Sequence, residues 1–232
     1  VLFRSAVIQI VCDDRLAYVA NYLDDSVQVV DWRARKVIRT ALLVGPATPS
    51  LARRGEAIFL DGTRSLDQWY SCSSCHYEGG TNSVAMDTRN DGTTFTFKTV
   101  LPLYHFQHTA PWTWHGWQED ATDAMEKSLT STMLGPTPEA ADVQALLAYL
   151  NSLSPPANPF READGSLSEA AARGERVFHS DVAGCANCHS GPFFTDGQIH
   201  DVGTGGFRDQ YEGYNTPSLI GVYRKVLLMH DG

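Results

Sequence analysis

The sequence predicts a mainly α-helical protein in which two helical units follow one another, behind a short antiparallel β segment. An internal repeat is the first observation: the tripeptide Arg-Gly-Glu at residues 54–56 recurs at residues 173–175, and a Cys-x-x-Cys-His motif follows each copy. The second is a proline-rich stretch between the copies, at residues 154–159. The third is a set of β-branched and aromatic runs within residues 6–44, which is typical of strands separated by polar turns.

Composition places the chain among ordinary globular proteins and excludes some partners. Its 232 residues are 43% hydrophobic and 19% charged, and the formal net charge is −9. We do not expect an acidic chain of this kind to bind nucleic acid, and no apolar run reaches the roughly 18 residues that a membrane-spanning helix needs. The chain shows no signal peptide and begins inside an apolar run, so we expect it to be part of a longer protein.

The β segment, residues 1–45, is predicted to hold strands at residues 17–21, 26–31 and 36–40. Its sequence contains Tyr-Val-Ala-Asn, a polar turn and a valine-rich strand that ends in Asp. This order resembles the YVTN-type β-propeller repeat. The resemblance implies one propeller blade, and an unrelated antiparallel meander is the alternative. Since one blade cannot bury its own faces, either further blades precede it or it packs on the next unit. Cys12 lies in an apolar run, and we expect a buried thiol there.

The first helical unit is predicted to span residues 46–153. Ser50 should begin a helix over residues 51–60, because serine is a good N-cap and an apolar pattern follows it. Thr137, which is followed by a proline and an acid, should begin the last helix of the unit, and that helix should end near Leu153.

The second unit is predicted at residues 166–232, after a linker at residues 154–165. Ser166 and Glu169 form a capping-box pattern, which predicts that a helix begins there. No terminal helix like that of the first unit follows the second Cys-x-x-Cys-His motif, so we expect the second unit to be C-terminally incomplete.

Two cysteine motifs carry the chemistry. They consist of Cys72, Cys75 and His76, and of Cys185, Cys188 and His189. Two thiols at this spacing attach one porphyrin through thioethers in c-type haem proteins, and the following histidine becomes an iron ligand. Cysteine pairs of a zinc site usually lie about 15–20 residues apart, and a thioredoxin-like pair needs neither the histidine nor a second copy. The motifs therefore predict two covalent haem c groups, each with its iron.

Phrases after the second motif carry a family resemblance. They read FFTDGQIHDVGTG at residues 193–205, NTPSLIGVYR at residues 215–224 and LMHDG at residues 228–232. With the two motifs, they resemble the bacterial dihaem cytochrome c peroxidase and MauG superfamily over residues 50–232. The resemblance implies two class I cytochrome c-like haem domains in tandem, the second of them truncated, and a close helix crossing at the glycine of each repeated tripeptide.

The chain departs from this superfamily near the first motif. Relatives have an aromatic-Trp-Asp-Gly phrase whose tryptophan lies between the two haems, whereas residues 113–116 read Thr-Trp-His-Gly here. The resemblance therefore assigns the electron path between the haems to Trp114. At the position of the acid that helps to break the peroxide bond the chain has Met133, and the distal histidine expected soon after His76 is missing.

The sixth ligands of the two irons follow from spacing and residue type. Met133 lies at a cytochrome-like separation from His76 and from the last helix, so we expect it to bind the first iron; Met125 and Met86 are its rivals. Other groups that could bind the first iron or donate hydrogen bonds to haem propionates are His105, His108 and His115. For the second iron the chain offers His200, Met229 and His230, and the ligand could also lie beyond residue 232. His200 could serve instead through hydrogen bonding or packing.

Three functions follow from this sequence. The first is a periplasmic dihaem c-type cytochrome that transfers electrons through Trp114, with a small redox protein as donor or acceptor. The second is an active peroxidase that reduces hydrogen peroxide; it needs an open iron and a nearby acid or base, and Glu119, Asp120 and Glu126 lie near the right stretch. The third is a binding protein in which the propeller recognises a partner and the haems sense its redox state.

Overall fold

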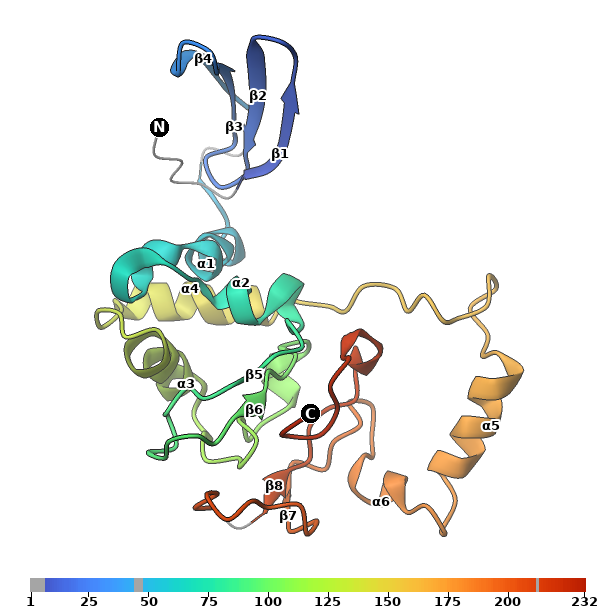
Figure 1. Cartoon of the computed structure of the whole chain (residues 1–232). Helices are drawn as coiled ribbons and strands as arrows, with labels where there is room; N and C mark the ends of the chain where they lie inside the picture. Colours follow the sequence, from blue (N-terminus) through green and yellow to red (C-terminus); the bar gives the residue numbers. More distant parts are fainter. Residues whose placement is uncertain (1–6, 44–47, 212) are drawn as a thin grey trace.

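The computed structural model describes residues 7–43, 48–211 and 213–232 (Figure 1). Residues 1–6 and 44–45 of the predicted β segment, and residues 46–47 of the predicted first helical unit, lie outside the described residues. From the N-terminus, the chain forms a four-stranded sheet, a helical unit, an extended segment and a second unit whose last stretch returns to the first unit (Figure 1).

The N-terminal sheet is an antiparallel meander paired in sequential order. Its strands are β1 (Val7–Cys12), β2 (Leu16–Asn21), β3 (Ser26–Asp31) and β4 (Lys36–Leu42). Alternate residues of the central strands form a small core, in which Ala17 and Val19 pack with Val30. The three predicted strands are present and β1 adds a fourth. A meander of this kind does not distinguish a propeller blade from another antiparallel sheet, so the propeller stays a prediction.

The expected burial of Cys12 is wrong. The residue is exposed, because it ends the edge strand β1 at the turn into β2 and packs on no second layer. An apolar run alone does not indicate which of its residues the fold covers, and at a strand end the backbone turn decides.

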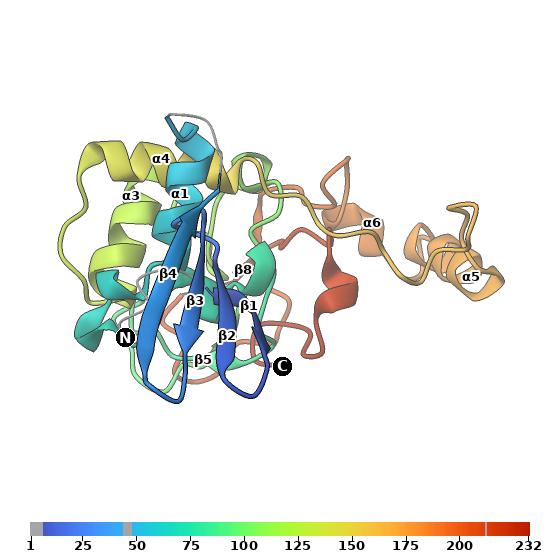
Figure 2. The same ribbon diagram turned by 90° about the horizontal axis from the view of Figure 1, so that it is seen from above.

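The sheet meets the first helical unit through the turn between β2 and β3. Figures 1 and 2 place the sheet beside α1 (Leu51–Leu60). Tyr22 Oη donates a hydrogen bond to Glu56 at 2.7 Å, and the Arg53 guanidinium lies 4.3 Å from the centre of the Tyr22 ring. Arg53 also pairs with Asp25 at 3.3 Å. The contact is therefore a polar one, built around a single arginine.

Two crossing helices organise the first unit. A Cβ on Gly55 of α1 would lie 1.9 Å from the Ala145 carbonyl oxygen in α4 (Ala140–Leu150), so the helix backbones touch at this glycine. Ser50 caps α1 as predicted, and its Oγ accepts the Arg53 amide at 3.1 Å. The prediction for the start of α4 is wrong by two residues: its N-cap is Glu139, where the backbone is still extended, rather than Thr137.

The core of the first unit lies between α1, α4 and α3 (Ala121–Lys127). Its most deeply buried side chains are Phe59, Val143, Leu146 and Leu150. A π-helical turn, Ser128–Thr132, extends α3 and adds the buried Leu129. On the remaining side lie the one-turn helix α2 (Cys72–Cys75) and the small sheet of β5 (Ala85–Met86) and β6 (Lys98–Thr99).

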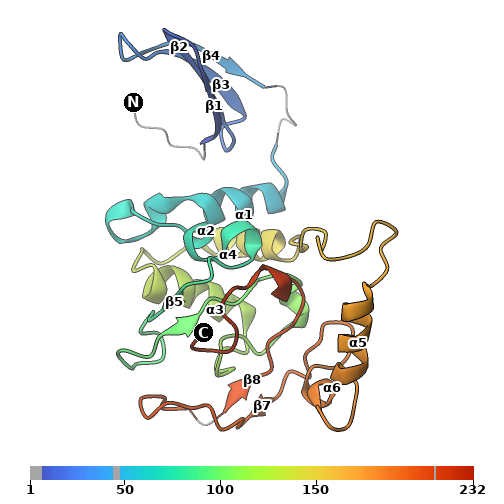
Figure 3. The ribbon, with the colours of Figure 1, turned by 45° about the vertical axis from the view of Figure 1, so that its right-hand side comes forward.

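The second unit consists of α5 (Glu169–Phe178), α6 (Cys185–Cys188) and the two-stranded sheet of β7 (Ile199–His200) and β8 (Tyr214–Asn215). An extended segment carries α5 to one side of the molecule (Figure 3). The N-cap of α5 is Ser168, whose Oγ accepts the Ala171 amide at 3.2 Å, so the capping box expected from Ser166 does not form. No residue of α5 is buried.

The C-terminal stretch returns to the first unit and is held there by Thr99 of β6. The Thr99 amide donates to the His230 carbonyl at 2.7 Å, and its hydroxyl donates to the Met229 carbonyl at 2.7 Å. Lys225 Nζ donates to the same hydroxyl at 3.1 Å, and Trp114 Nε1 donates to the Thr99 carbonyl at 2.6 Å. One buried threonine, Thr99, is thus bonded both to the C-terminal stretch of the second unit and to the Trp114 ring of the first.

Helices cover only a minority of the described residues and alternate with small antiparallel sheets, so a mainly α class is not confirmed. The physical reason is that long loops, rather than helices, occupy most of the stretch between α2 and α3. None of the helices in the described ranges is long and apolar enough to cross a membrane. The domain boundaries at residues 46–153 and 166–232 stay predictions.

We expect Gly55→Ala to destabilise the protein by about 1–3 kcal/mol, because the new methyl group would overlap the Ala145 backbone and push α1 away from α4. The free energy of unfolding, measured by chemical denaturation, tests this. Gly174→Ala is the matched control in the second copy of the repeat: a Cβ there meets no atom within 4 Å, and alanine is the better helix former by up to about 1 kcal/mol. Equal effects at the two glycines would contradict the close crossing.

Candidate haem-binding sites

The first motif lies on a single helical turn. α2 carries Cys72 and Cys75, and His76 ends it, with the His76 amide donating to the Cys72 carbonyl at 2.9 Å. At the start of the turn, the Ser71 amide donates to Ser74 Oγ at 3.0 Å. The Cys-x-x-Cys-His spacing thus brings two thiols and an imidazole to one place.

One hydrogen bond orients the His76 ring. His76 Nδ1 lies 2.9 Å from the Leu101 carbonyl oxygen, and since a carbonyl only accepts, Nδ1 carries the proton and Nε2 keeps its lone pair. Burial lowers the pKa of His76 to about 4, so the ring is neutral near pH 7. A neutral imidazole with a free Nε2, held by a carbonyl at Nδ1, is the form that binds a metal ion.

A cavity of about 320 Å³ adjoins this motif, and Cys72, Cys75 and His76 line it. Burial raises the pKa of Cys72 to about 12, which keeps its thiol neutral within an apolar wall. Three tryptophans close together in the sequence, Trp112, Trp114 and Trp117, also line this cavity. We refer to it as the first cavity.

Three methionines line the first cavity. Met133 and Met125 are buried, whereas Met86 is partly exposed. Met133 Sδ lies 3.6 Å from Cys72 Sγ, and Met86 Sδ lies 3.4 Å from Cys75 Sγ. The structure thus brings the predicted ligand Met133 and both of its rivals to the cavity that holds His76.

The three acids considered for a peroxidase lie elsewhere. Within the described part of the chain, Glu119, Asp120 and Glu126 are not among the residues that line the first cavity. Asp120 instead caps α3, and its Oδ1 accepts the amides of Thr122 and Asp123 at 2.8 and 3.0 Å. None of these carboxylates is in place to exchange a proton with a molecule in this cavity.

The second motif repeats the geometry of the first. α6 carries Cys185 and Cys188, and the amide of His189 donates to the Cys185 carbonyl at 3.0 Å. His189 Nδ1 lies 3.1 Å from the Phe194 carbonyl oxygen, so Nε2 is again the free nitrogen. Each motif therefore lies on a one-turn helix of its own, and in each a backbone carbonyl accepts from the histidine Nδ1.

A second cavity, of about 280 Å³, adjoins this motif and is lined by Cys188, His189 and His200. His200 Nε2 lies 2.7 Å from Asp196 Oδ2, so the predicted His200 is engaged by a carboxylate and keeps only Nδ1 free. The Cys188 Sγ, a carboxylate oxygen of Asp196 and a ring nitrogen of His200 all lie within 4.8 Å of one another. His200 is therefore close to an attachment thiol of this motif.

Both other candidates for the second iron also line the second cavity. His230 is buried and stacks on the Tyr214 ring, with centroids 4.2 Å apart. Met229 is 53% exposed, although it contributes to the cavity wall. The stretch Met229–His230 reaches this position through its hydrogen bonds to Thr99.

Trp114 lies in the walls of both cavities. Its ring is buried, and the bond from Nε1 to the Thr99 carbonyl fixes it on the side where the C-terminal stretch returns. Lys225 Nζ lies 5.1 Å from the centre of the ring. The predicted bridging residue is thus shared by the two cavities.

The other predicted histidines divide between two environments. His105 and His108 line neither cavity; both rings pack on Phe193, at 5.4 and 4.4 Å between centroids, where the second unit contacts the first. His115 lines the first cavity and is buried.

Sequence reasoning missed the groups that orient the site. The acceptors for His76 and His189 are the backbone carbonyls of Leu101 and Phe194, and any residue type can supply a carbonyl, so no sequence signal marks them. Asp196 did carry a signal, because it lies four residues before His200, although on a loop rather than on a helix.

No protein-family model matches the chain. Two curated proteins are similar in sequence. The hydrazine synthase subunit gamma of Kuenenia stuttgartiensis is 28% identical over 81% of this chain and 67% of its own length. The cytochrome-c peroxidase IdrP2 of Denitromonas iodatirespirans is 25% identical over 81% of this chain and 59% of its own length. The chain thus spans about two thirds or less of these relatives.

Two solved structures share the fold. The hydrazine synthase of Kuenenia stuttgartiensis, studied under xenon pressure, aligns with a TM-score of 0.68 at 24% identity, over 81% of this chain and 76% of that chain. A MauG-like protein associated with microbial copper homeostasis aligns with a TM-score of 0.56 at 18% identity, over 82% and 73%. The sequence similarity to a cytochrome-c peroxidase supports a cytochrome c peroxidase-like relationship, and the likeness to the two solved structures concerns the fold.

We expect His76→Ala and His189→Ala to change the spectrum of one haem each. Each histidine has its own cavity and its own carbonyl partner, so losing one ring should leave the other iron site intact. Optical and electron-spin spectra of the exported protein test this. His108→Ala, outside both cavities, is the control and should leave both spectra unchanged. Equal changes at both haems in either variant would refute the two separate sites.

Proposed function

We propose that the chain is a c-type cytochrome of the MauG and cytochrome c peroxidase-like superfamily that carries two covalent haems and passes electrons between them. The observation that carries this proposal is that Trp114 lies in the walls of two cavities, each of which contains the cysteine and histidine of one Cys-x-x-Cys-His motif. The names of the relatives, a cytochrome-c peroxidase and a MauG-like protein, support the same cofactor class.

The residues around each cavity suit a haem. In the first cavity, Cys72 and Cys75 would form the two thioethers and His76 Nε2 would bind the iron, with Nδ1 held by Leu101. In the second unit, Cys185, Cys188 and His189 would take the same roles. Each cavity is lined mainly by apolar and aromatic side chains, which exclude water from a flat hydrophobic group.

A bound haem supplies one-electron chemistry, and the protein sets the path and the potential. Trp114 places an aromatic ring between the cavities, and its bond to Thr99 keeps the ring from turning. The Leu101 and Phe194 carbonyls hold the rings of His76 and His189 and raise their basicity as ligands. These groups hold their geometry without moving, as fast electron transfer requires.

Met133 is our proposal for the sixth ligand of the first iron. It is buried, lines the cavity that holds His76, and carries a thioether, which favours reduced iron. Its Sδ lies beside Cys72 Sγ, so the side chain would have to turn away from Cys72 to bind the iron. Met125, in the same wall, is the alternative.

We propose His200 as a ligand of the second iron or as a hydrogen-bonding residue near it. Its contact with Asp196 restricts which ring nitrogen is available. The carboxylate engages Nε2, so a direct bond to iron would have to use Nδ1. A hydrogen-bonding role close to the Cys188 thioether fits the observed contacts as well. His230, which is buried in the same cavity, is the other histidine available.

Peroxide reduction is the second candidate function. The similarity to a cytochrome-c peroxidase favours it, and so does the buried His115 in the wall of the first cavity, which can exchange a proton there. Against it stand the positions of Glu119, Asp120 and Glu126 outside this cavity. We rank it below electron transfer for that reason.

The proposed setting follows from the cofactor. Haem c is attached outside the bacterial cytoplasm, so we propose a periplasmic protein whose partner is a small redox protein. The net charge of −9 suits a partner with a basic surface. As a further alternative, the N-terminal sheet would be one blade of a propeller that binds a partner, with the haems sensing redox state.

We expect a red, folded protein only when the chain is exported in a host with a cytochrome-maturation system. The apolar walls of the two cavities need the porphyrin to cover them, so expression in the cytoplasm should give a colourless and unstable chain. A pyridine haemochrome assay with a protein determination measures two haems per chain. Folded red protein from the cytoplasm without maturation factors would count against covalent attachment.

We expect Met133→Ala to open the first iron, remove the weak near-infrared sulfur-to-iron band and lower the potential of that haem, because a thioether ligand stabilises reduced iron. Met125→Ala, which removes a buried methionine from the same cavity, is the matched control and should keep the band. Spectra and redox titration of the holoprotein measure both effects. If Met125→Ala removes the band instead, Met125 is the ligand; if the unmodified protein turns over peroxide rapidly, the peroxidase function replaces electron transfer.

A further inference from the structure

Three large apolar side chains are exposed on two loops of the first unit. They belong to Leu66 and Trp69, in the loop at residues 65–70, and to Leu134, in the loop at residues 132–135; their exposed fractions are 50%, 79% and 59%. We refer to them as the Trp69 patch. None of the three lines either cavity, so a haem bound in the first cavity would leave them exposed. Exposed apolar side chains that gather in one place mark a surface that contacts another molecule.

Two hydrogen bonds hold these loops side by side. The Leu66 amide donates to the Met133 carbonyl at 2.9 Å, and the Tyr70 hydroxyl donates to the Thr132 carbonyl at 2.5 Å. Because one bond lies near each end of the first loop, the whole loop is fixed against the second. The three apolar side chains therefore belong to the same part of the surface.

The backbone is strained where it presents the patch. Asp67 and Gln68 have φ angles of +54° and +59°, and Leu134 has a φ of +52°. This left-handed region is unfavourable for a residue with a Cβ, and leucine is rarely found there. Burial does not compensate the strain at Leu134, since the residue is mostly exposed. Strain of this kind persists at sites where function requires the conformation.

An aromatic pair leads from the patch to the first cavity. The ring centroids of Trp69 and Tyr70 are 5.6 Å apart in an edge-to-face arrangement, and Tyr70 lines the cavity. On the other loop, Met133 lines the cavity and Leu134 follows it directly. Each loop thus exposes an apolar side chain next to a residue of the cavity wall. A molecule bound to the patch would lie close to the contents of the first cavity.

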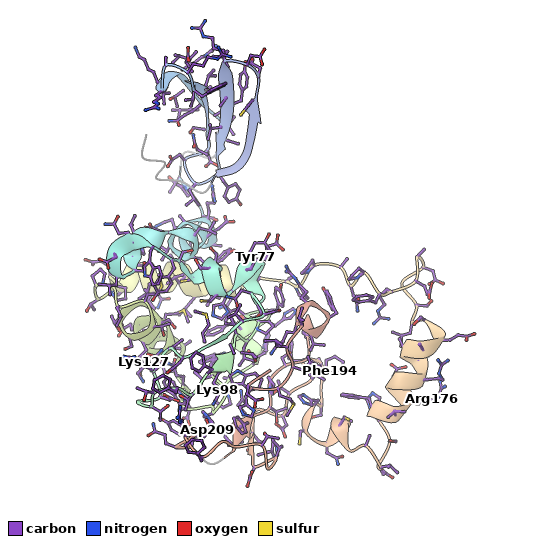
Figure 4. The ribbon with its side chains drawn as sticks, viewed as in Figure 1. Tyr77, Lys98, Lys127, Arg176, Phe194 and Asp209 are labelled. Carbon is purple, nitrogen blue, oxygen red and sulfur yellow. The ribbon has the colours of Figure 1, made fainter. Side chains whose placement is uncertain are left out.

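The charges near the patch favour a basic partner. The two loops contain one charged residue, Asp67, which is exposed. Arg64, which precedes them, is paired with Asp142 at 2.8 Å. Lys127, at the end of α3, lies over the Trp117 ring at 5.6 Å from its centre (Figure 4). With a net charge of −9 on the whole chain, the patch suits an apolar surface that is bordered by lysines.

We propose that the Trp69 patch is the surface on which a small basic redox protein docks to exchange electrons with the haem of the first cavity. The inference rests on the proposed function, since that haem accepts or donates the electron. The partner carries a one-electron metal centre behind an apolar surface bordered by lysines. One electron crosses between the two metals, so one is reduced as the other is oxidised, and no proton or bond is transferred. Trp69 supplies the contact, and neither its ring nor that of Tyr70 is oxidised.

The size of the patch suits a brief encounter. Electron-transfer complexes have small interfaces, and a single tryptophan in such an interface can supply much of the binding energy. The partner therefore binds through one anchor and separates again after the electron has crossed. Loops that are already fixed by two hydrogen bonds lose little conformational freedom when they bind.

The experiment measures electron exchange between the exported holoprotein and mitochondrial cytochrome c, a small lysine-rich cytochrome, after a pyridine haemochrome assay has established two haems. Stopped-flow mixing gives the second-order rate constant in both directions, because one of them is always downhill. The variants are Trp69→Ala and Leu134→Gly, each of which removes a side chain of the patch. Gln68→Gly is the control for strain, and Phe160→Ala removes a 69% exposed aromatic ring far along the chain from both loops.

We expect Trp69→Ala to lower the rate constant about tenfold or more, because it removes the anchor of the contact. Leu134→Gly should lower it by less and raise the unfolding temperature, since glycine adopts a positive φ without strain. A slower reaction of a more stable protein separates docking from folding. Gln68→Gly should raise the unfolding temperature without slowing the reaction, and Phe160→Ala should change neither.

Several outcomes would overturn the inference. They are a Trp69→Ala rate within about twofold of the unmodified rate, an equal loss in Phe160→Ala, and a changed haem spectrum in Trp69→Ala. An unmodified protein that exchanges no electrons with cytochrome c, or whose rate does not fall with ionic strength, also overturns it. Dimers that Trp69→Ala abolishes would show that a second copy of the chain covers the patch. Absence of haem would instead refute the proposed function.

Discussion

The hydrogen bond from Trp114 Nε1 to the Thr99 carbonyl is the constraint on which the two candidate sites depend. It is buried, and leaving either group without a partner would cost about 1–3 kcal/mol. Through its amide and hydroxyl, the same threonine holds Met229 and His230 of the second unit. The ring that both cavities share and the stretch that closes the second cavity are thus attached to one residue of a two-residue strand. A shift of that strand would change both cavities together.

This arrangement explains how a chain with little helix builds two sites. The core between α1 and α4 positions the one-turn helix α2, but loops supply most of the remaining wall of the first cavity. The second unit has no comparable core, because no residue of α5 is buried, and its cavity is closed largely by the returning stretch. The two halves of the repeat are alike in their motifs and unlike in what supports them. Gly55 allows a close backbone contact between α1 and α4 in the first half, whereas a Cβ at Gly174 would meet nothing within 4 Å.

The sequence was sufficient where function requires a fixed residue type. The cap at Ser50 could be predicted, because capping needs a particular side chain. Residues of the two Cys-x-x-Cys-His motifs and Trp114, which the sequence indicated as candidate site residues, line the two cavities. The sequence was insufficient where the backbone or the tertiary contacts decide. The carbonyls that orient His76 and His189 have no side-chain signature, and the approach of Asp209 to His115 joins residues far apart in the chain. The start of α4 was misplaced because Thr137 has the chemistry of a cap but an extended chain follows it.

His76 and His189 differ in how far along the chain their hydrogen-bond partners lie. His189 bonds to Phe194, only a few residues later, whereas His76 bonds to Leu101 across a much longer loop. Closing the longer loop costs more conformational entropy, so a short peptide around the second motif can orient its imidazole before the rest of the chain has folded. The first motif has to wait until Leu101 is in place. The two imidazoles should therefore become oriented in the reverse of their order along the chain, that of the second motif first.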